Sequence, residues 1–286
     1  MTIELGGIDA GGLGDAVRAL REWQHEGAPM QLHPGDLGWH ARFGPAATAA
    51  AVRTWRRGDR IVAVGMLDGP DLLRMTISPD ALQDDELSRR IAEDLSGCDV
   101  LPAGKAYVEA PKTALLQTRL AEAGWDTDEP WTPLRYDLAE PVPDPGVRIE
   151  VAGPEQAPVR VAVHRASFER SKFTTEAWHL MAAAAPYSDA RCLIAYDATD
   201  TAVAAVTVWS AGAGRPGLLE PMGVHHDHRG HGYGRAICLG AAGALRAMGS
   251  SSALVCTPSR NVAAVATYAS AGYVPMPEVR DRRRDA

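Results

Sequence analysis

The chain has 286 residues, a length typical of one large domain or two of ordinary size. Hydrophobic residues make up 46% and charged residues 23%, close to the average of soluble globular proteins. The net charge of −7 argues against a general nucleic-acid or anionic-membrane binder, because such proteins need a basic face. No apolar run approaches the about 20 residues that cross a bilayer, and the N-terminus lacks the segments of a signal peptide.

The cysteines are too widely spaced to suggest a CxxC metal or redox site. They are Cys98, Cys192, Cys238 and Cys256. Reduced, buried thiols are the interpretation that fits this spacing. With no targeting segment either, the sequence predicts a cytoplasmic protein.

The first half alternates short apolar runs with helical patterns. It is predicted to form, in chain order, strands at 60–65 and 72–77, a helix at 84–96, a strand at 106–109, a helix at 113–123 and a strand at 131–138. A His- and Trp-rich stretch at 33–40 is expected to be a loop. It either reaches over the cleft of the other half or caps its own domain.

Three prolines and a glycine at 141–146 can continue neither a helix nor a central strand, so we place a linker there. This divides the chain into domains 1–140 and 147–286. The second half is predicted to form, in order, a strand at 147–151, helices at 154–168 and 174–184, strands at 191–196, 202–210 and 217–224, a helix at 232–248, a strand at 252–257, a helix at 261–271 and a strand from Tyr273. The basic segment 280–284 is expected to be a solvated tail.

The two halves share landmarks as well as an order of elements. Ala-Gly-Trp at 123–125 and Ala-Gly-Tyr at 271–273 lie 148 positions apart, and the predicted strand ends Ile77 and Val224 lie 147 apart. This agreement predicts an internal duplication. The fold class is therefore α/β, with two mixed, mostly antiparallel sheets flanked by helices.

A loop with three alternate glycines, Gly230, Gly232 and Gly234, leads from a predicted strand into a long predicted helix. Glycine lets the backbone approach a ligand closely, and the start of a helix offers free N–H groups and a positive dipole end. Arg229 and Arg235 flank the glycines. The pattern predicts a pyrophosphate cradle, but it has neither the lysine of a Walker motif nor the spacing of a dinucleotide-binding fold.

The loop R-x-x-G-x-G at 229–234 resembles the [RQ]-x-x-G-x-[GA] loop of the GNAT superfamily of acyl-CoA-dependent N-acetyltransferases. The segment N-x-x-A-x-x-x-Y at 261–268, with Ala-Gly-Tyr after it, resembles a second motif of that family. The resemblance covers residues 147 to about 280 and extends, more narrowly, to actinobacterial proteins with two GNAT domains in tandem. It implies tandem GNAT folds and acetyl-CoA as the co-substrate.

The resemblance also implies roles for single residues. Tyr268 is expected to protonate the leaving thiolate, and Glu220 is the expected general base. Several family members carry that base two positions earlier, where this chain has Leu218, so Glu220 needs a strand bulge to take the role. The residues expected to bind the cofactor are Met222, Gly223, Val224, Arg229, Gly230, His231, Gly232, Tyr233, Gly234, Arg235 and Asn261.

Other residues lie on elements that face the acceptor in this family. They are His164, Phe168, Trp178, His179 and Trp209, and each could instead be a core or rim residue. In the first half, the loop that corresponds to the glycine loop carries Asp84, Asp85 and Glu86, which would repel a pyrophosphate. Leu120 stands where Tyr268 would be. The first half is therefore expected to be a GNAT-like domain without a cofactor site.

The sequence favours acetyl transfer to the amine of a small molecule, by direct attack in a ternary complex. The acceptor is expected to be a small molecule, not a basic protein. One alternative is a catalytically silent acyl-CoA-binding module. Another is a metal-binding protein that uses His225, His226, His228 and His231, although no metal is expected.

Overall fold

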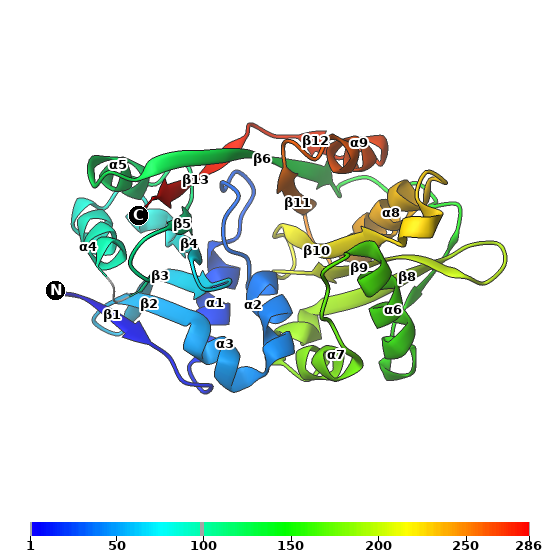
Figure 1. Cartoon of the computed structure of the whole chain (residues 1–286), viewed down its shortest axis with the longest axis horizontal. Helices are drawn as coiled ribbons and strands as arrows, with labels where there is room; N and C mark the ends of the chain where they lie inside the picture. The colour runs from blue at the N-terminus through cyan, green and yellow to red at the C-terminus, as the bar shows by residue number, and fades with distance from the viewer. Residues whose placement is uncertain (1, 98–99, 286) are drawn as a thin grey trace. The chain divides into compact units, whose positions relative to one another are not determined.

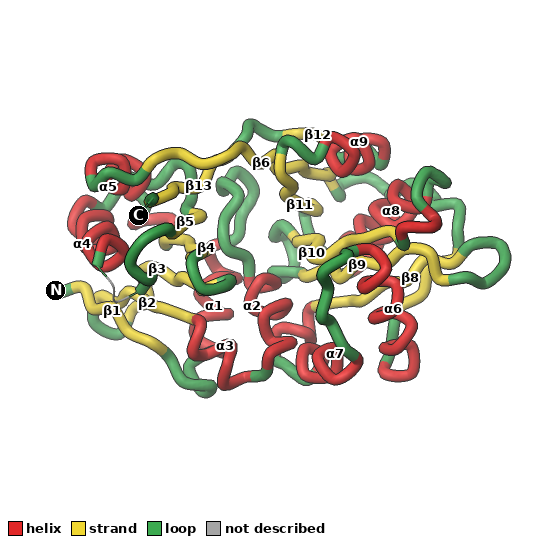
Figure 2. The backbone as a smooth tube through the Cα atoms, viewed as in Figure 1, coloured by secondary structure: helices red, strands yellow, loops and turns green. Residues whose placement is uncertain are grey.

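The structure is a computed structural model that describes residues 2–97 and 100–285 (Figures 1 and 2). Cys98 lies outside the described residues. Cys192, Cys238 and Cys256 are free thiols, as expected, and the first two are buried. None of the helices in the described ranges has both the length and the apolar character needed to span a membrane.

The chain forms two compact units that differ from the two sequence halves. Unit 1 comprises 1–33, 45–131 and 278–286, and unit 2 comprises 34–44 and 132–277. The first half thus contributes 34–44 and 132–140 to unit 2, and the second half contributes 278–286 to unit 1. The expected linker 141–146 is an irregular segment inside unit 2.

Unit 1 is a mixed sheet with helices. Its strands are β1 (Ile3–Gly7), β2 (Val52–Arg57), β3 (Arg60–Leu67), β4 (Leu72–Ile77), β5 (Ala106–Glu109), β13 (Val279–Arg284) and the first part of β6 (Asp126–Asp137). Its helices are α1 (Leu13–Trp23), α3 (Pro45–Ala51), α4 (Asp85–Ser96) and α5 (Leu116–Glu122). The strand order is β1-β2-β3-β4-β5-β13-β6, and all these pairs are antiparallel except β4 with β5, which α4 connects.

Unit 2 has the same kind of architecture. Its strands are the end of β6, β7 (Arg148–Val151), β8 (Ala190–Tyr196), β9 (Ala202–Trp209), β10 (Gly217–Val224), β11 (Ser252–Pro258) and β12 (Val274–Pro275). Its helices are α2 (Pro34–His40), α6 (Ala157–Ser167), α7 (Thr175–Ala182), α8 (Tyr233–Ala247) and α9 (Val262–Ser270). The order is β6-β11-β10-β9-β8-β7, with antiparallel pairing from β7 to β10, and β10 and β11 are parallel neighbours that α8 connects (Figure 1).

The two faces of the unit 2 sheet are covered by different helices. Val206 and Val208 of β9 belong to the apolar core that also contains Ile237 and Leu245 of α8. Thr207, between these valines, points to the other face and accepts a hydrogen bond from Arg160 of α6. The alternation expected of a buried antiparallel strand therefore holds on β9.

The predicted duplication is present in the order of elements: β3-β4-α4-β5-α5-β6 is repeated as β9-β10-α8-β11-α9-β12. The tripeptides at 123–125 and 271–273 also form the same backbone hydrogen bond at the ends of their helices. The N–H of Trp125 donates to the carbonyl of Leu120 at 3.0 Å, and the N–H of Tyr273 donates to that of Tyr268 at 3.1 Å. The glycine before each aromatic residue has a positive φ, 85° and 95°, which caps α5 and α9 in the left-handed conformation.

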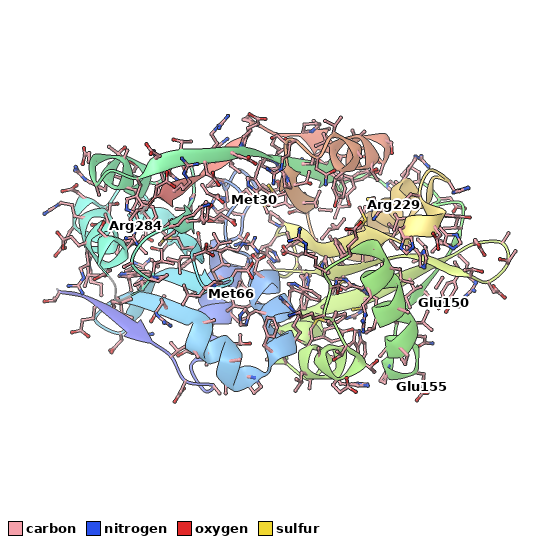
Figure 3. All side chains as sticks on the ribbon, in the orientation of Figure 1. Met30, Met66, Glu150, Glu155, Arg229 and Arg284 are labelled. Atoms are coloured by element: carbon pink, nitrogen blue, oxygen red, sulfur yellow. The ribbon has the colours of Figure 1, made fainter. Side chains whose placement is uncertain are left out.

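Two sequence expectations are wrong. The stretch 33–40 is not a loop, since α2 spans Pro34–His40. The segment 280–284 is not a solvated tail, since β13 pairs with β5 and β6. Its arginines have structural partners: Arg284 (Figure 3) donates to the carbonyls of Leu95 and Gly104, each at 3.0 Å. A basic sequence gives no hydrophobic alternation, so only the neighbouring strands reveal this strand.

Candidate functional site

The pairing of β10 with β9 is interrupted by a bulge. Leu219 pairs with Val208 and Met222 with Val206, so Glu220 and Pro221 together lie opposite Thr207. A bulge bends the strand and redirects its side chains. The bulge that the sequence comparison required at Glu220 is therefore present in the structure.

Glu220 and Tyr268 share one electrostatic environment. Tyr268 on α9 is only 6% exposed. Burial raises the pKa of its phenol, and Cys238 and then Glu220 raise it further. A phenol with a raised pKa keeps its proton at neutral pH, which is the form a general acid needs.

The parallel pairing of β10 and β11 is short. It joins Gly217 to Ala253 and Leu218 to Leu254, although β10 continues to Val224 and β11 to Pro258. Within the described residues, no pair joins the two strands beyond this point. Backbone N–H and C=O groups require partners, so two diverging strand edges suit an extended ligand with amide groups.

Helix α8 begins without a side-chain cap. Its N-cap residue is Gly232, which has φ 85° and ψ −4°, and the loop residues from Arg229 to Gly232 are exposed. The first helical hydrogen bond runs from the N–H of Ala236 to the carbonyl of Gly232 at 3.0 Å. The earlier N–H groups of the first turn have no side-chain cap, so this helix start suits an anion at the positive end of the helix dipole.

The three glycines of the loop serve two purposes. Gly230 and Gly232 have positive φ values of 81° and 85°, and a Cβ atom on either would meet nothing within 4 Å. A Cβ atom on Gly234 would lie 2.7 Å from Thr267 of α9. The first two glycines therefore shape an open loop, and the third lets α8 and α9 pack closely.

The two arginines beside the glycines hold the loop in place. Arg229 (Figure 3) donates from Nη2 to the carbonyl of Ser167 at the end of α6 at 2.9 Å. Arg235 Nε donates to the carbonyl of Ser270 at the end of α9 at 3.0 Å. A cation is favourable at the C-terminal end of a helix. The guanidinium groups thus anchor the loop to two helices, and the anion site consists of backbone N–H groups.

The equivalent helix of unit 1 is capped by its own chain. Asp84 is the N-cap residue of α4, and its carboxylate accepts the N–H of Leu87 at 2.9 Å and pairs with Arg57 at 2.8 Å. A protein carboxylate therefore occupies the place that an external anion would take. Leu120, the counterpart of Tyr268, is fully buried and carries no proton to donate.

The other residues expected to bind the cofactor lie around the end of β10 and the start of α9. Met222, Gly223 and Val224 are half-buried. A Cβ atom on Gly223 would lie 2.4 Å from that of Ser167, so only glycine lets α6 approach β10 here. Asn261 caps α9, because its Oδ1 accepts the N–H of Ala264 at 3.2 Å.

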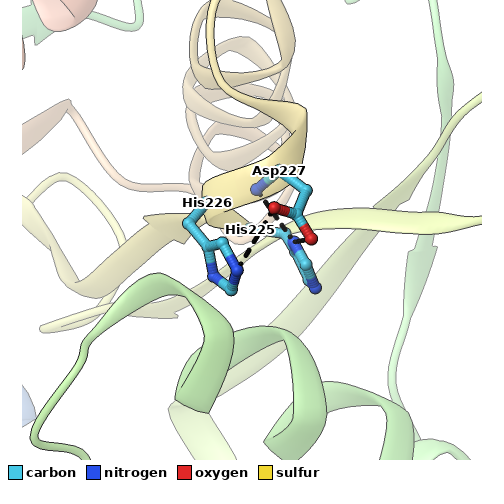
Figure 4. A group of neighbouring side chains, drawn as sticks. All are labelled: His225, His226 and Asp227. Carbon is cyan, nitrogen blue, oxygen red and sulfur yellow. Dashed lines mark hydrogen bonds and ion pairs between the residues drawn. The ribbon is translucent and has the colours of Figure 1, made fainter.

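The histidines of the loop form a smaller group than the sequence suggested. His225, His226 and Asp227 have potential ligand atoms within 4.8 Å of one another (Figure 4). His231 instead stacks on Tyr233, with ring centroids 6.1 Å apart. His225 Nδ1 accepts the N–H of Asp227 at 3.2 Å, and His226 Nδ1 lies 2.7 Å from the carbonyl of Ala166. These contacts hold the turn against the end of α6.

The residues expected to face the acceptor are mostly buried. Trp209, Trp178 and His164 are 1%, 2% and 7% exposed, and Phe168 is 39% exposed. His164 packs against Phe168 and Phe173, and also against Trp39, with ring centroids 4.8 to 5.6 Å apart. Trp39 lies on α2, so the segment 34–44 contributes to this aromatic cluster of unit 2 and does not cap the first half.

Helix α2 also supports the bulge. A Cβ atom on Gly35 or Gly38 would lie 2.5 or 2.2 Å from the Trp209 side chain, so both glycines are needed for this contact. The indole N–H of Trp209 donates to the carbonyl of Glu220 at 2.7 Å. The spacing of the glycines on one helical face was a signal for this contact that the sequence interpretation missed.

His164 is not a candidate base. Burial, and secondarily the nearby charges of Arg160 and Arg42, lower its pKa to about 3. Its imidazole is therefore neutral at physiological pH and has little tendency to take up a proton. Arg160 itself was absent from the sequence-based candidates.

Comparison with known proteins gives one family match and several structures of similar fold. The model of the family described as "Acetyltransferase (GNAT) family" matches residues 160–273. The chain is similar to the structures of a GNAT-family acetyltransferase from Colwellia psychrerythraea (TM-score 0.62, 16% identity, covering 100% of this chain and 99% of that one) and of a tandem GNAT protein from the clavulanic acid biosynthesis pathway (0.60, 17%, 99% and 98%). A third is a GCN5-related N-acetyltransferase from Sphaerobacter thermophilus (0.59, 16%, 99% and 95%). Curated protein sequences give no match.

At these identities the similarity shows the fold, and it extends over the whole chain. The expected α/β fold class, with GNAT folds in tandem, is confirmed. The narrower resemblance to actinobacterial tandem proteins stays a prediction.

The shifted pKa of His164 gives a testable pH dependence. An unfolded histidine has a pKa of about 6.5, so between pH 6.5 and about 3 the unfolded chain binds a proton that the native protein does not. Stability should therefore fall as the pH drops, by about 1.4 kcal/mol per pH unit. Denaturant unfolding at pH 7 and pH 5 should show wild type losing about 2 kcal/mol more than His164→Phe. Equal losses in both proteins would show that His164 titrates normally.

Proposed function

A GNAT acetyltransferase domain occupies residues 160–273, and from this premise we propose that unit 2 transfers the acetyl group of acetyl-CoA to the amine of a small molecule. The observation that carries the proposal is the uncapped start of α8 beside two diverging strands. Unit 1 has the same kind of fold but binds no acyl-CoA, because Asp84 caps α4, the helix equivalent to α8.

The residues of unit 2 fit acetyl-CoA. The first-turn N–H groups of α8 and the open loop at Gly230 and Gly232 suit a pyrophosphate. The free edge of β10 at 222–224 suits the amide-containing pantetheine arm, with the side-chain amide nitrogen of Asn261 as a further donor. Bound acetyl-CoA supplies an acetyl group activated as a thioester.

Two side chains of unit 2 have the chemistry that amide formation needs. Glu220, on the bulge, accepts the proton that the amine loses as its nitrogen–carbon bond forms. Tyr268 holds its proton at Oη and gives it to the sulfur as the carbon–sulfur bond breaks. Burial raises the pKa of the Cys238 thiol, which makes it a poor nucleophile, so a direct transfer in a ternary complex is favoured over a cysteine-linked intermediate.

The glycine loop is tested by a pair of nearly isosteric changes at Gly232. Aspartate and asparagine both tolerate the positive φ of 85°, but only aspartate places a negative charge at the anion site. Calorimetry should show one acetyl-CoA per chain in wild type and modest weakening in Gly232→Asn. Gly232→Asp should bind about 100-fold or more weakly, because opposed like charges cost several kcal/mol. Equal affinities of the two variants, or two equivalent sites in wild type, would contradict the assignment.

The proton donor is tested by Tyr268→Phe. Loss of a general acid lowers kcat by about 10²–10⁴-fold, and acetyl-CoA affinity should stay near wild type because the ring is retained. Tyr136→Phe is the matched control, since the Tyr136 ring lies 5.3 Å from that of Tyr273 in the same core. A normal rate in Tyr268→Phe would assign the proton to water or another residue.

The base is tested by Glu220→Gln. Glutamine keeps the shape of the side chain but takes no proton, so the acidic limb of the pH–rate profile should disappear. Activity should partly recover at high pH, where the free amine is already neutral. A raised KM with an unchanged profile would make Glu220 an anchor for a cationic substrate instead, and wild-type kinetics throughout would make it structural.

A further inference from the structure

Unit 2 contains a buried guanidinium group without a counter-charge. Arg160 on α6 is 1% exposed, and its Nη2 donates to Thr207 Oγ1 at 3.2 Å. Its Nε and Nη1 atoms are buried and have no acceptor among the described residues. No carboxylate in the described ranges forms an ion pair with it.

The groups around Arg160 are neutral. Burial lowers its pKa, and the groups that oppose this effect are the thiol of Cys192 and the phenol of Tyr187, not a carboxylate. Burial raises the pKa of Tyr187, so its phenol is protonated at neutral pH. His164, on the same helix, is neutral because its pKa is about 3. An isolated buried cation costs several kcal/mol, so this arrangement is unfavourable unless an anion completes it.

A second buried donor lies in the same region. Trp178 of α7 is 2% exposed, and its indole N–H has no acceptor within the described part of the chain. Its ring contacts that of Tyr187 at 5.9 Å, and Tyr187 also faces Arg160. Arg160 and Trp178 thus each have a buried donor without an acceptor, and Tyr187 interacts with both side chains, which indicates a ligand oxygen.

These donors are connected to the proposed base. The ring of Tyr187 lies 6.1 Å from that of Trp209, whose indole N–H holds the carbonyl of Glu220. Thr207, the partner of Arg160, is the residue opposite the bulge that carries Glu220. Tyr187 is half-buried, so this group of aromatic side chains is partly exposed at Tyr187.

We propose that Arg160, together with the indole of Trp178, binds a carboxylate of the acceptor, so that the acceptor is an amine that also carries a carboxylate. The inference rests on the proposed acetyltransferase function and names its substrate class. A carboxylate matches the planar guanidinium and balances its single charge. A phosphate dianion would leave an excess negative charge among neutral groups.

The test compares matched ligands on the full chain with CoA present. Amino acids, including β- and γ-amino acids, are each paired with the corresponding carboxamide, which keeps the amine and removes the negative charge. Thermal unfolding reports binding, and CoA release from acetyl-CoA reports turnover. At least one acid should raise the melting temperature where its amide does not, with kcat/KM higher by about 100-fold or more, because a buried charge left without its partner is strongly unfavourable.

Two variants of Arg160 and one control variant assign this preference to Arg160. Arg160→Met keeps the length of the side chain without its charge, and it should fold at least as stably as wild type because a buried, unbalanced charge is removed. It should lose the preference for acid over amide while binding acetyl-CoA normally. Arg160→Lys should retain part of the preference, and Arg165→Met, an exposed position on the same helix, should retain all of it.

The outcomes separate this inference from the proposed function. Equal response to acids and amides, no response to either, an unchanged preference in Arg160→Met, or stabilisation by inorganic phosphate alone would each overturn the carboxylate site. Should Arg160→Met fail to fold, the comparison of Arg160→Lys with Arg165→Met decides. If acids stabilise wild type through Arg160 but no amine releases CoA, the carboxylate site stands and the transferase function fails.

Discussion

The site of unit 2 depends on one buried side chain, Trp209. Its ring is covered by α2, which can come so close only because Gly35 and Gly38 have no Cβ atom. Its indole N–H holds the carbonyl of Glu220 and so supports the bulge in β10. A hydrogen bond of this kind contributes about 1 kcal/mol net, but the buried aromatic ring contributes several times more. Packing around the ring therefore helps to fix the backbone of Glu220, and a segment from the first half of the sequence supplies part of that packing.

The equivalent helices α4 and α8 differ in the residue at their N-terminus. That residue determines whether the first turn is capped by the protein or left open to a ligand. In unit 1, Asp84 caps α4 and is itself paired with Arg57, so the start of this helix is satisfied within the protein. In unit 2, Gly232 leaves the first turn of α8 uncapped, which sacrifices the stability of a cap, typically about 1 kcal/mol. Arg160 likewise lacks a stabilising partner, because the groups around its guanidinium are neutral. The uncapped helix start and the unbalanced charge both reduce stability. Both are explained if a bound ligand supplies the missing partner.

Much of the fold was predictable from local patterns, and the exceptions have clear causes. Strands β4, β5 and β10 and helix α8 match their predicted bounds within a residue or two, because Gly and Pro mark their ends and their apolar spacing is regular. The strands β1 and β2 and the helices α1 and α3 were not predicted. Strand β13 was mistaken for a tail because its basic sequence has no apolar alternation, and α2 was mistaken for a loop because two of its seven residues are glycine.

By itself, the sequence determined the glycine loop, the tyrosine after it and the repeated order of elements, because each depends on residue types at short spacing. It did not determine that 34–44 belongs to unit 2 and 278–286 to unit 1, since such exchanges depend on contacts between residues far apart in the chain. It also gave no sign that Arg160 is buried without a carboxylate partner. A charge on a helix is usually solvated, and only the tertiary structure decides whether water, a protein group or a ligand will neutralise it.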